Sequence, residues 1–371
     1  MIACALRLQL RPLAPVLDRW PLLRSTPGLA QLQWARSDHL ATIEPLSVAA
    51  FAHAILSTPN ESVVLDIGAN VGAYTLLAGA LGRRVVAVEM QPGCLEWQRC
   101  HSVQLDQIRG RVRLLNRFVA TNEHVAPVRV PKTGCAVMAS PSAVAGRWPH
   151  GLRTKETRKL DKATPADLRN ATRMVRPIQL ADYVRRHFPH ARSIVAKVDT
   201  EGYEIQVLES MRALWPQLRA LVVELQPAAW KFANVSAVRG LETLTALMAE
   251  QSMLALTLPH AKSGIEARAR IVFDPCAYKM HHVAKGDLVP PTVGLDTARV
   301  LNAEGLMGFV EHMLRFPGKS SGWFHEVLLI RKAELCTYRS THKHTPVKDA
   351  LGASRGMSHT LRCAQRALAL R

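Results

Sequence analysis

The sequence predicts an α/β fold with a doubly wound, mostly parallel sheet of seven strands. Short apolar runs bounded by turn residues alternate with amphipathic segments, a pattern typical of strand–helix–strand units. Apolar residues make up 48% of the 371 residues, enough for a large buried core. The predicted strands, the fourth with its exit loop, lie at residues 62–67, 84–90, 111–116, 193–202, 219–227, 253–259 and 323–332.

Helices are expected between these strands because apolar residues there recur at spacings of three and four. A first helix is predicted at about 48–57, and a second at 71–82, where Gly82 suits a C-terminal cap. In the segment that begins at Tyr203, Pro216 stops the helix. The remaining helices are predicted at residues 94–105, 178–188 and 239–250.

Three parts of the chain depart from this alternation. Residues 1–45 are rich in Arg and Leu and poor in acids, so an organelle transit peptide and an ordinary leading helix both fit. The folded domain is expected over 46–335, with insertions near 120–177, read as edge strands with a basic loop, and near 260–320, read as irregular. Residues 336–371 are predicted to be a poorly ordered basic tail.

The formal net charge of +19 favours anionic partners. The excess is peripheral: residues 336–371 hold seven Lys and Arg against one acid, and residues 151–177 hold eight against three. Nucleic-acid binding by the core domain is therefore not favoured over a solvated basic tail. No apolar run approaches the roughly 20 residues that span a bilayer.

The seven cysteines are scattered, and none forms a CxxC pair. We therefore expect neither a disulfide framework nor a structural zinc site, and we predict a reducing intracellular compartment, either cytoplasm or an organelle. His281 and His282 are interpreted as a solvated pair rather than as a base or metal ligands. No metal-binding residues are predicted.

The first strand ends in an acid and a glycine-containing turn, with Asp66, Gly68 and Gly72 in the stretch DIGANVG. The second glycine is one place late for the G-x-G-x-x-G fingerprint that lets a backbone meet a pyrophosphate. A carboxylate beside this turn also repels a pyrophosphate and matches a cation, such as a ligand amino group. We expect the two glycines to let the turn pass close to a ligand.

Glu89 ends the second strand, 21 residues after Gly68, where a carboxylate can accept the hydroxyls of a ribose. A ligand with a ribose, an amino-acid moiety and no phosphate is S-adenosylmethionine. An NAD-binding or nucleotide-free domain of the same architecture is the alternative, which the acid and the glycine spacing disfavour.

Ionisable residues also follow the fourth strand, in the stretch AKVDTEGYE with Lys197, Asp199 and Glu201, and Glu224 ends the fifth. Parallel strands place these groups at the same edge as Asp66, and charges buried there without compensation are costly. A structural interpretation is that the acids favour the dipole of the following helix. We expect both roles to contribute, with Asp199 or Glu201 functional.

The blocks VVLDIGANVGAYTLLAGALG, VVAVEMQP, VDTEGYEIQVL and LVVELQP resemble the FkbM-type methyltransferases of the Rossmann-like, S-adenosylmethionine-dependent class I group. The resemblance covers roughly residues 60–258, with a weaker echo at 323–332. It implies that Asp199 and Glu201 lie near the transferred methyl, where we expect Lys197 to tune the charge. It further implies a cofactor-binding set of Asp66, Gly68, Asn70, Gly72 and Glu89, with Phe118 or Val119 near the adenine.

The function predicted from the sequence is a methyltransferase acting on an oxygen of a small molecule, sugar or glycan. The [DN]-PP-[FYW] tetrapeptide expected for methylation of amino groups on bases is absent from the sequence. The alternatives are an RNA methyltransferase, and a non-catalytic cofactor-binding fold that docks to nucleic acid or membrane through its basic flanks. The insertions, where acceptor choice normally resides, differ most from the family pattern.

Overall fold

The structure of the protein is a computed structural model. It describes residues 45–102, 110–121, 124–132, 172–258, 300–315 and 325–334, the single residues 108 and 135, and two short strands that pair near the N-terminus, β1 (Arg11–Pro12) and β2 (Gln33–Trp34). The predicted leader otherwise lies outside the described residues, as do the C-terminal tail, His281 and His282.

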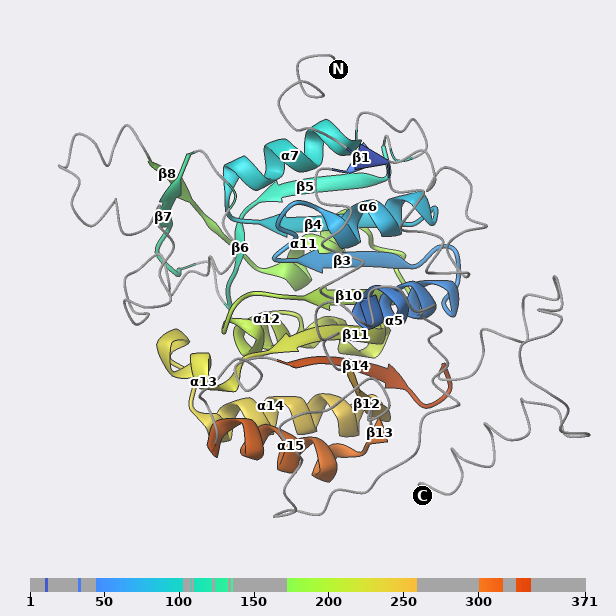
Figure 1. The fold of residues 1–371 in the computed structure, drawn as a ribbon, viewed down its shortest axis with the longest axis vertical. Helices are drawn as coiled ribbons and strands as arrows, with labels where there is room; N and C mark the ends of the chain where they lie inside the picture. The colour runs from blue at the N-terminus through green and yellow to red at the C-terminus, as the bar shows by residue number, and fades with distance from the viewer. Residues whose placement is uncertain are drawn as a thin grey trace, which may run out of the picture.

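The central sheet has eight strands in the order β13-β12-β14-β11-β10-β3-β4-β5 (Figure 1). The seven predicted strands are confirmed, and the sheet is mostly parallel. Strand β14 runs antiparallel to both neighbours, and the additional two-residue strand β13 pairs antiparallel with β12. The bounds are β3 (Val63–Ile67), β4 (Arg84–Glu89), β5 (Val112–Asn116), β10 (Ile194–Val198), β11 (Leu218–Leu225), β12 (Met253–Leu258), β13 (Val300–Leu301) and β14 (His325–Arg331).

The strand order reverses between β3 and β10. From β3 the chain moves outward to β4 and β5, and it then returns to the other side of β3 to form β10 and β11. In open α/β sheets, ligands bind outside the carboxyl ends of the strands at such a switch point. The arrows of β3, β4 and β5 end on the side from which β7 and β8 project (Figure 1).

Two buried hydrophobic clusters hold helices against the opposite faces of the sheet. One cluster joins α5 (Pro45–Leu56) and α6 (Ala73–Ala80) to residues such as Val64 and Val195. The other joins the opposite face, including Leu65 and Ala196, to α11 (Leu180–His187), α12 (Glu204–Ser210), α14 (Ala237–Glu250) and α15 (Ala303–Arg315). The remaining helical segments are α7 (Pro92–Ser102), η2 (Arg212–Gln217), α13 (Pro227–Trp230) and η3 (Lys231–Ala233).

The interpretation of 260–320 as irregular is wrong for its last part, because residues 303–315 form α15. Its buried residues Leu306, Phe309, Val310 and Met313 follow helical spacing and belong to the core cluster on that face. A helix pattern was therefore present in the sequence. Residues 259–299 lie outside the described part of the chain.

The strands predicted within 120–177 do not extend the central sheet. Strand β6 (Phe118–Val119) pairs with β9 (Pro177–Ile178), and β7 (Val128–Pro131) pairs with β8 (Thr172–Val175), as two separate small sheets. A third hydrophobic cluster, of Met90, Phe118, Ala120, Val130 and Val175, attaches them to the end of β4. The edge-strand prediction is corrected accordingly: these strands pack beside the carboxyl edge of the sheet.

We expected no disulfide framework, but Cys94 and Cys135 form one disulfide. Their separation of 41 residues carries no local signal, and only the tertiary structure brings them together. The compartment stays a prediction. Among the described residues, we find no helix with the length and apolar character needed to cross a membrane.

We predict that Gly240→Ala destabilises the fold. A Cβ at this position of α14 would lie 2.2 Å from Cζ3 of Trp230, a fully buried ring whose Nε1 donates to Glu204. Overpacking of this kind costs about 1–3 kcal/mol, which outweighs the gain of up to about 1 kcal/mol from replacing a helical glycine. Denaturant unfolding should show a lower free energy of unfolding for Gly240→Ala. The control Val238→Ala, at an exposed position of the same helix, should have a free energy of unfolding close to that of the unaltered protein.

Candidate functional site

Acidic residues from four strands gather at the carboxyl edge of the sheet. Asp66 lies on β3 beside Ala87 of β4, and Glu89 follows two residues later on the same face. Lys197 of β10 is the register partner of Asp66 on the other side. Asp199 comes directly after β10, and the side chain of Glu224 lies near the end of β11. The predicted gathering of these charges at one edge is confirmed.

The turn after β3 is tied to both neighbouring strands. The Gly68 N–H donates to the carbonyl oxygen of Val88 at 2.9 Å, and the Asp199 N–H donates to that of Ile67, also at 2.9 Å. Gly68 has φ +79°, and a Cβ there would lie 1.7 Å from the backbone oxygen of Asp199. Gly72 has φ +89°, and its Cβ would meet Gln98 at 2.6 Å.

These contacts correct the physical reason for the two glycines. The sequence suggested that they make room for a ligand, whereas the structure fills the space beside them with the protein itself. Gly68 lets the exit of β10 press against the exit of β3, and Gly72 lets α7 approach the turn. A side chain is excluded at both sites by sterics and by the left-handed backbone.

Glu89 is held at the end of β4 by two backbone N–H groups. Asn70 donates to its Oε2 at 2.8 Å and Gln91 donates to its Oε1 at 2.7 Å. Burial raises the pKa of Glu89 to about 7, although both hydrogen bonds act in the opposite direction. The carboxylate therefore sits in a preformed position beside the turn, as the sequence predicted from its place at the strand end.

Asp66 is almost completely buried, and its Oδ2 accepts a hydrogen bond of 2.5 Å from the Thr75 hydroxyl of α6. Burial raises the pKa of Asp66 to about 6, while the Thr75 bond and the charge of Lys197 oppose this change. The cation that the sequence suggested for Asp66 is thus partly supplied within the protein. Thr75 was not identified from the sequence, although it lies in the quoted helix.

Lys197 connects the buried acids. Its Nζ lies 3.0 Å from Glu326 Oε1 and 3.4 Å from Asp199 Oδ2, and it also lies 5.1 Å from the centre of the Tyr74 ring. Only 1% of the Lys197 side chain is exposed. Glu326 was missed by the sequence analysis, and an acid at the start of an apolar strand was the available signal. Buried charges persist where they are paired.

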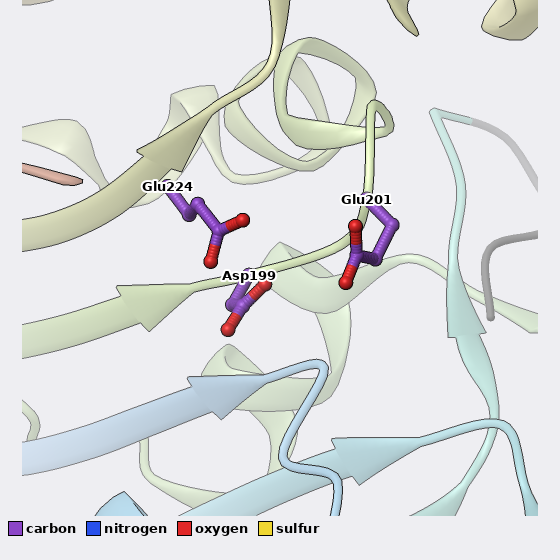
Figure 2. Close-up of side chains that lie close together, drawn as sticks. All are labelled: Asp199, Glu201 and Glu224. Atoms are coloured by element: carbon purple, nitrogen blue, oxygen red, sulfur yellow. The ribbon is translucent and has the colours of Figure 1, made fainter. Parts of the chain in front are cut away.

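Asp199, Glu201 and Glu224 turn their carboxylates toward one another (Figure 2). One oxygen from each lies within 4.8 Å of the others, a spacing that could hold a metal ion. Gln226, also missed from the sequence, donates its Nε2 to Glu201 at 2.6 Å and to Glu224 at 2.8 Å. Gln226 thus provides a hydrogen-bond donor and Lys197 a positive charge for this group.

Glu204 has the structural role suggested for acids at the start of the helix. Its Oε1 accepts from the Gly202 N–H at 2.6 Å and its Oε2 accepts from Trp230 Nε1 at 2.9 Å. Burial raises its pKa to about 7. Glu201, by contrast, has φ +54°, and its side chain points toward Asp199 and Glu224 (Figure 2). The helix-dipole interpretation therefore fits Glu204 better than Glu201.

Phe118 and Val119 are both buried on β6 but belong to different clusters. Phe118 packs with Met90, the residue after Glu89, whereas Val119 joins the core on the α11 and α12 face. Asn116 Nδ2 donates to the carbonyl oxygens of Glu89 and Met90, which fixes the end of β4 against β5.

The residues present fit a nucleoside with a cationic group and no phosphate. Glu89 places its carboxyl group at the end of β4, beside a turn that lies next to Asp66 and Asp199, and Lys197 balances part of the negative charge. A pyrophosphate would meet like charge there. Together with the doubly wound sheet, these features fit the Rossmann-like class I fold with S-adenosylmethionine as its cofactor.

The comparison with protein families is specific. Residues 66–251, about half of the chain, match the model described as "Methyltransferase FkbM domain". The protein belongs to this family of methyltransferases. A comparison with curated proteins gives no match.

Solved structures that resemble the chain do so at low identity. A SAM-dependent methyltransferase from Agrobacterium tumefaciens has 11% identity and a TM-score of 0.26 over 47% of this chain and 42% of that one. Precorrin-6y C5,15-methyltransferase from Geobacter metallireducens GS-15 has 14% identity and a TM-score of 0.27, with 55% and 76% covered. The plantazolicin methyltransferase BpumL, in complex with SAH, has 10% identity and a TM-score of 0.31, with 86% and 94% covered. The chain thus spans less than half of the first of these proteins.

We predict that stability falls as the pH rises from 4.5 through about 7. Glu89 keeps its proton in the folded state up to about pH 7 but releases it near 4.5 when unfolded. Its stabilising effect is therefore complete below 4.5 and lost above about 7, and Asp66 and Glu204 act in the same direction.

Glu89→Gln removes one of these groups. The decrease in unfolding free energy between pH 4.5 and about 7 should therefore be smaller in this variant, by roughly 3 kcal/mol. Denaturant unfolding at a series of pH values measures the effect. Glu209→Gln, which removes a carboxylate paired with Arg239 on α14, serves as the control for a charge change away from this edge. Equal profiles for Glu89→Gln and the unaltered protein would contradict the assignment.

Proposed function

We propose that the protein transfers the methyl group of S-adenosylmethionine to a hydroxyl oxygen of a small molecule, sugar or glycan. The observation that carries this proposal is the position of Asp199 and Glu201. Both carboxylates are partly exposed, and the backbone of Asp199 presses against Gly68 of the donor turn. Acidic side chains that can take a proton from a hydroxyl thus lie directly beside the candidate donor site.

The cofactor supplies a methyl group on a sulfonium, which is electrophilic without help from the protein. In our proposal Glu89 accepts hydrogen bonds from the ribose hydroxyls, and Asn70 holds Glu89 in place. Asp66 provides negative charge near the amino-acid end. Phe118 is favoured over Val119 as the adenine neighbour because it packs beside Glu89 through Met90.

The residues that act on the acceptor are Asp199 and Glu201. One of them accepts the hydroxyl proton while the acceptor oxygen attacks the methyl carbon in line with the departing sulfur. Gln226 orients Glu201, and Lys197 holds Asp199. Lys197 is too deeply buried to reach an acceptor, so we assign it a positioning role.

An RNA acceptor is the second candidate, supported by the basic composition of residues 151–177. A protein that neutralises several phosphates loses affinity steeply as salt rises. RNA affinity should therefore be measured between about 50 and 200 mM salt. An enzyme that contacts many phosphates should lose affinity on the order of a thousandfold over this range. A small-molecule enzyme should bind RNA weakly at every salt concentration. A basic flank that docks a non-catalytic fold would bind without turnover.

We predict that S-adenosylmethionine binds and NAD does not. Glu89→Gln should weaken donor binding by about tenfold, because an amide offers one acceptor oxygen where the carboxylate offers two. Isothermal titration calorimetry measures the binding of S-adenosylmethionine and of NAD to the unaltered protein and to Glu89→Gln. Glu209→Gln serves as the control variant. Heat for NAD and none for the methyl donor would refute the proposed function.

We predict that turnover by the variants Asp199→Asn and Glu201→Gln shows which of the two acids is the general base. Loss of a general base lowers turnover by about 10²–10⁴-fold, while donor affinity stays close to that of the unaltered protein. A screen of hydroxyl-bearing acceptors with labelled donor identifies a substrate, and kcat is then compared across the variants. Full turnover by either variant eliminates that residue as the base.

A further inference from the structure

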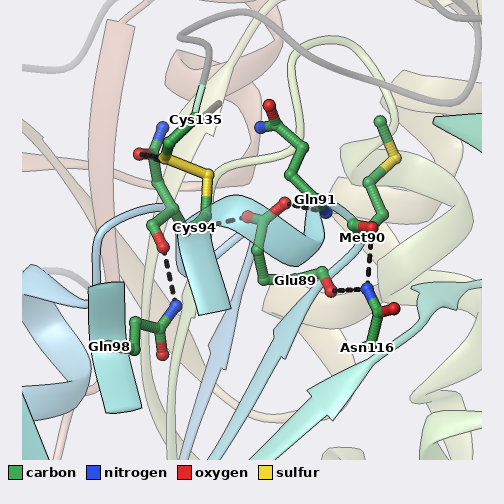
Figure 3. Close-up of a disulfide and its surroundings, with 8 residues drawn as sticks. Glu89, Met90, Gln91, Cys94, Gln98, Asn116 and Cys135 are labelled. Carbon is green, nitrogen blue, oxygen red and sulfur yellow. Dashed lines mark hydrogen bonds between the residues drawn. A yellow bond between two sulfur atoms is a disulfide. The ribbon is translucent and has the colours of Figure 1, made fainter. Parts of the chain in front are cut away.

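Asn70 is held through its backbone N–H, its carbonyl oxygen and its side-chain oxygen. Its φ of +48° is left-handed, a conformation that asparagine adopts more readily than most other non-glycine residues. Its N–H donates to Glu89 at 2.8 Å, and its carbonyl oxygen accepts from Gln98 Nε2 at 2.7 Å. Its side-chain oxygen lies 3.1 Å from Cys135 Sγ and 4.0 Å from Cys94 Sγ, the two sulfur atoms of the disulfide drawn in Figure 3.

The disulfide joins two parts of the chain across Asn70. Cys94 is completely buried in the first turn of α7, the helix that follows Glu89, and Cys135 is half-buried after β7. The β7–β8 pair otherwise reaches this corner through the cluster around Met90. The crosslink thus fixes Cys135 to α7, next to the turn that carries Asn70.

We propose that the Cys94–Cys135 disulfide is a positioning group for the methyl donor, acting through Asn70, and that its reduction weakens donor binding. This inference rests on the proposed role of Glu89 and Asn70 in that site. The path has two contacts: the disulfide restrains the Asn70 side chain, and the Asn70 N–H restrains the Glu89 carboxylate.

The redox step requires a dithiol reductant. One thiolate of the reductant attacks the more accessible sulfur of Cys135, and the sulfur of Cys94 leaves as a thiolate. The second thiol of the reductant then resolves the mixed disulfide. The protein gains two electrons and two protons and holds two thiols, while the reductant becomes a disulfide.

Reduction changes the contact with Asn70 because two thiol sulfurs cannot remain at bonding distance. Cys94 is enclosed in the core, so the partly exposed Cys135 side chain is the one that moves. The Asn70 side chain then loses its contact with the disulfide, and in our proposal this loosens the hold of the Asn70 N–H on Glu89.

The test compares donor affinity in the oxidised and reduced full-length protein. Calorimetric titration with S-adenosylhomocysteine, after free-thiol counting of each state, should give a Kd about tenfold higher for the reduced form. Reoxidation should restore it. Cys135→Ser should match the reduced form and no longer respond to dithiothreitol, which controls for the five other cysteines (seven less two).

Asn70→Gly distinguishes positioning from a general loss of stability. Glycine accepts the left-handed backbone but has no side chain to touch the disulfide. Reduction should still lower the melting temperature of this variant, whereas its Kd should no longer depend on the redox state. A purely structural disulfide would change both quantities in both proteins, which would overturn the proposal.

The remaining outcomes separate this inference from the proposed function. Equal donor affinity of the oxidised and reduced protein overturns the inference and leaves the function intact. Absence of donor binding in both states refutes the function and the inference with it.

Discussion

The close contact between the exits of β3 and β10 determines the site. Gly68 has no side chain, and the space that a Cβ would occupy is taken by the carbonyl oxygen of Asp199. This contact places the turn expected to bind the donor directly against the strand exit that carries Asp199 and Glu201. The site therefore depends on a steric condition at one residue, and the polar residues around it are arranged on that basis.

Burial of several acids at one edge is the electrostatic consequence of this arrangement. Asp66, Glu89 and Glu204 all have raised pKa values because burial disfavours their charged forms. Lys197 offsets part of this cost by contacting Glu326 and Asp199 in the centre of the sheet. The edge thus combines a stabilised interior with partly exposed carboxylates, a combination suited to a cationic donor and a proton-releasing acceptor.

The segment between β5 and β10 adds a second set of contacts at this edge. Its β6 and β7–β8 strands pack around Met90 beside Glu89, and its disulfide reaches Asn70. The turn after β3 is thereby connected to strands that lie outside the central sheet. In our proposal, this connection lets the redox state of Cys135 affect the turn.

The sequence by itself determined the order of the seven main strands, most of the helices between them, the doubly wound class and the acids at the strand ends, because periodicity and turn residues are local signals. It also indicated Asp66, Glu89, Asp199 and Glu201 as candidates. Tertiary structure alone decided the partners that come from distant segments: Glu326 for Lys197, Gln226 for Glu201, and Cys135 for Cys94. Tertiary structure also decided that Gly68 makes room for the backbone of Asp199. The two residues are far apart in the sequence, so a local sequence pattern cannot predict their contact.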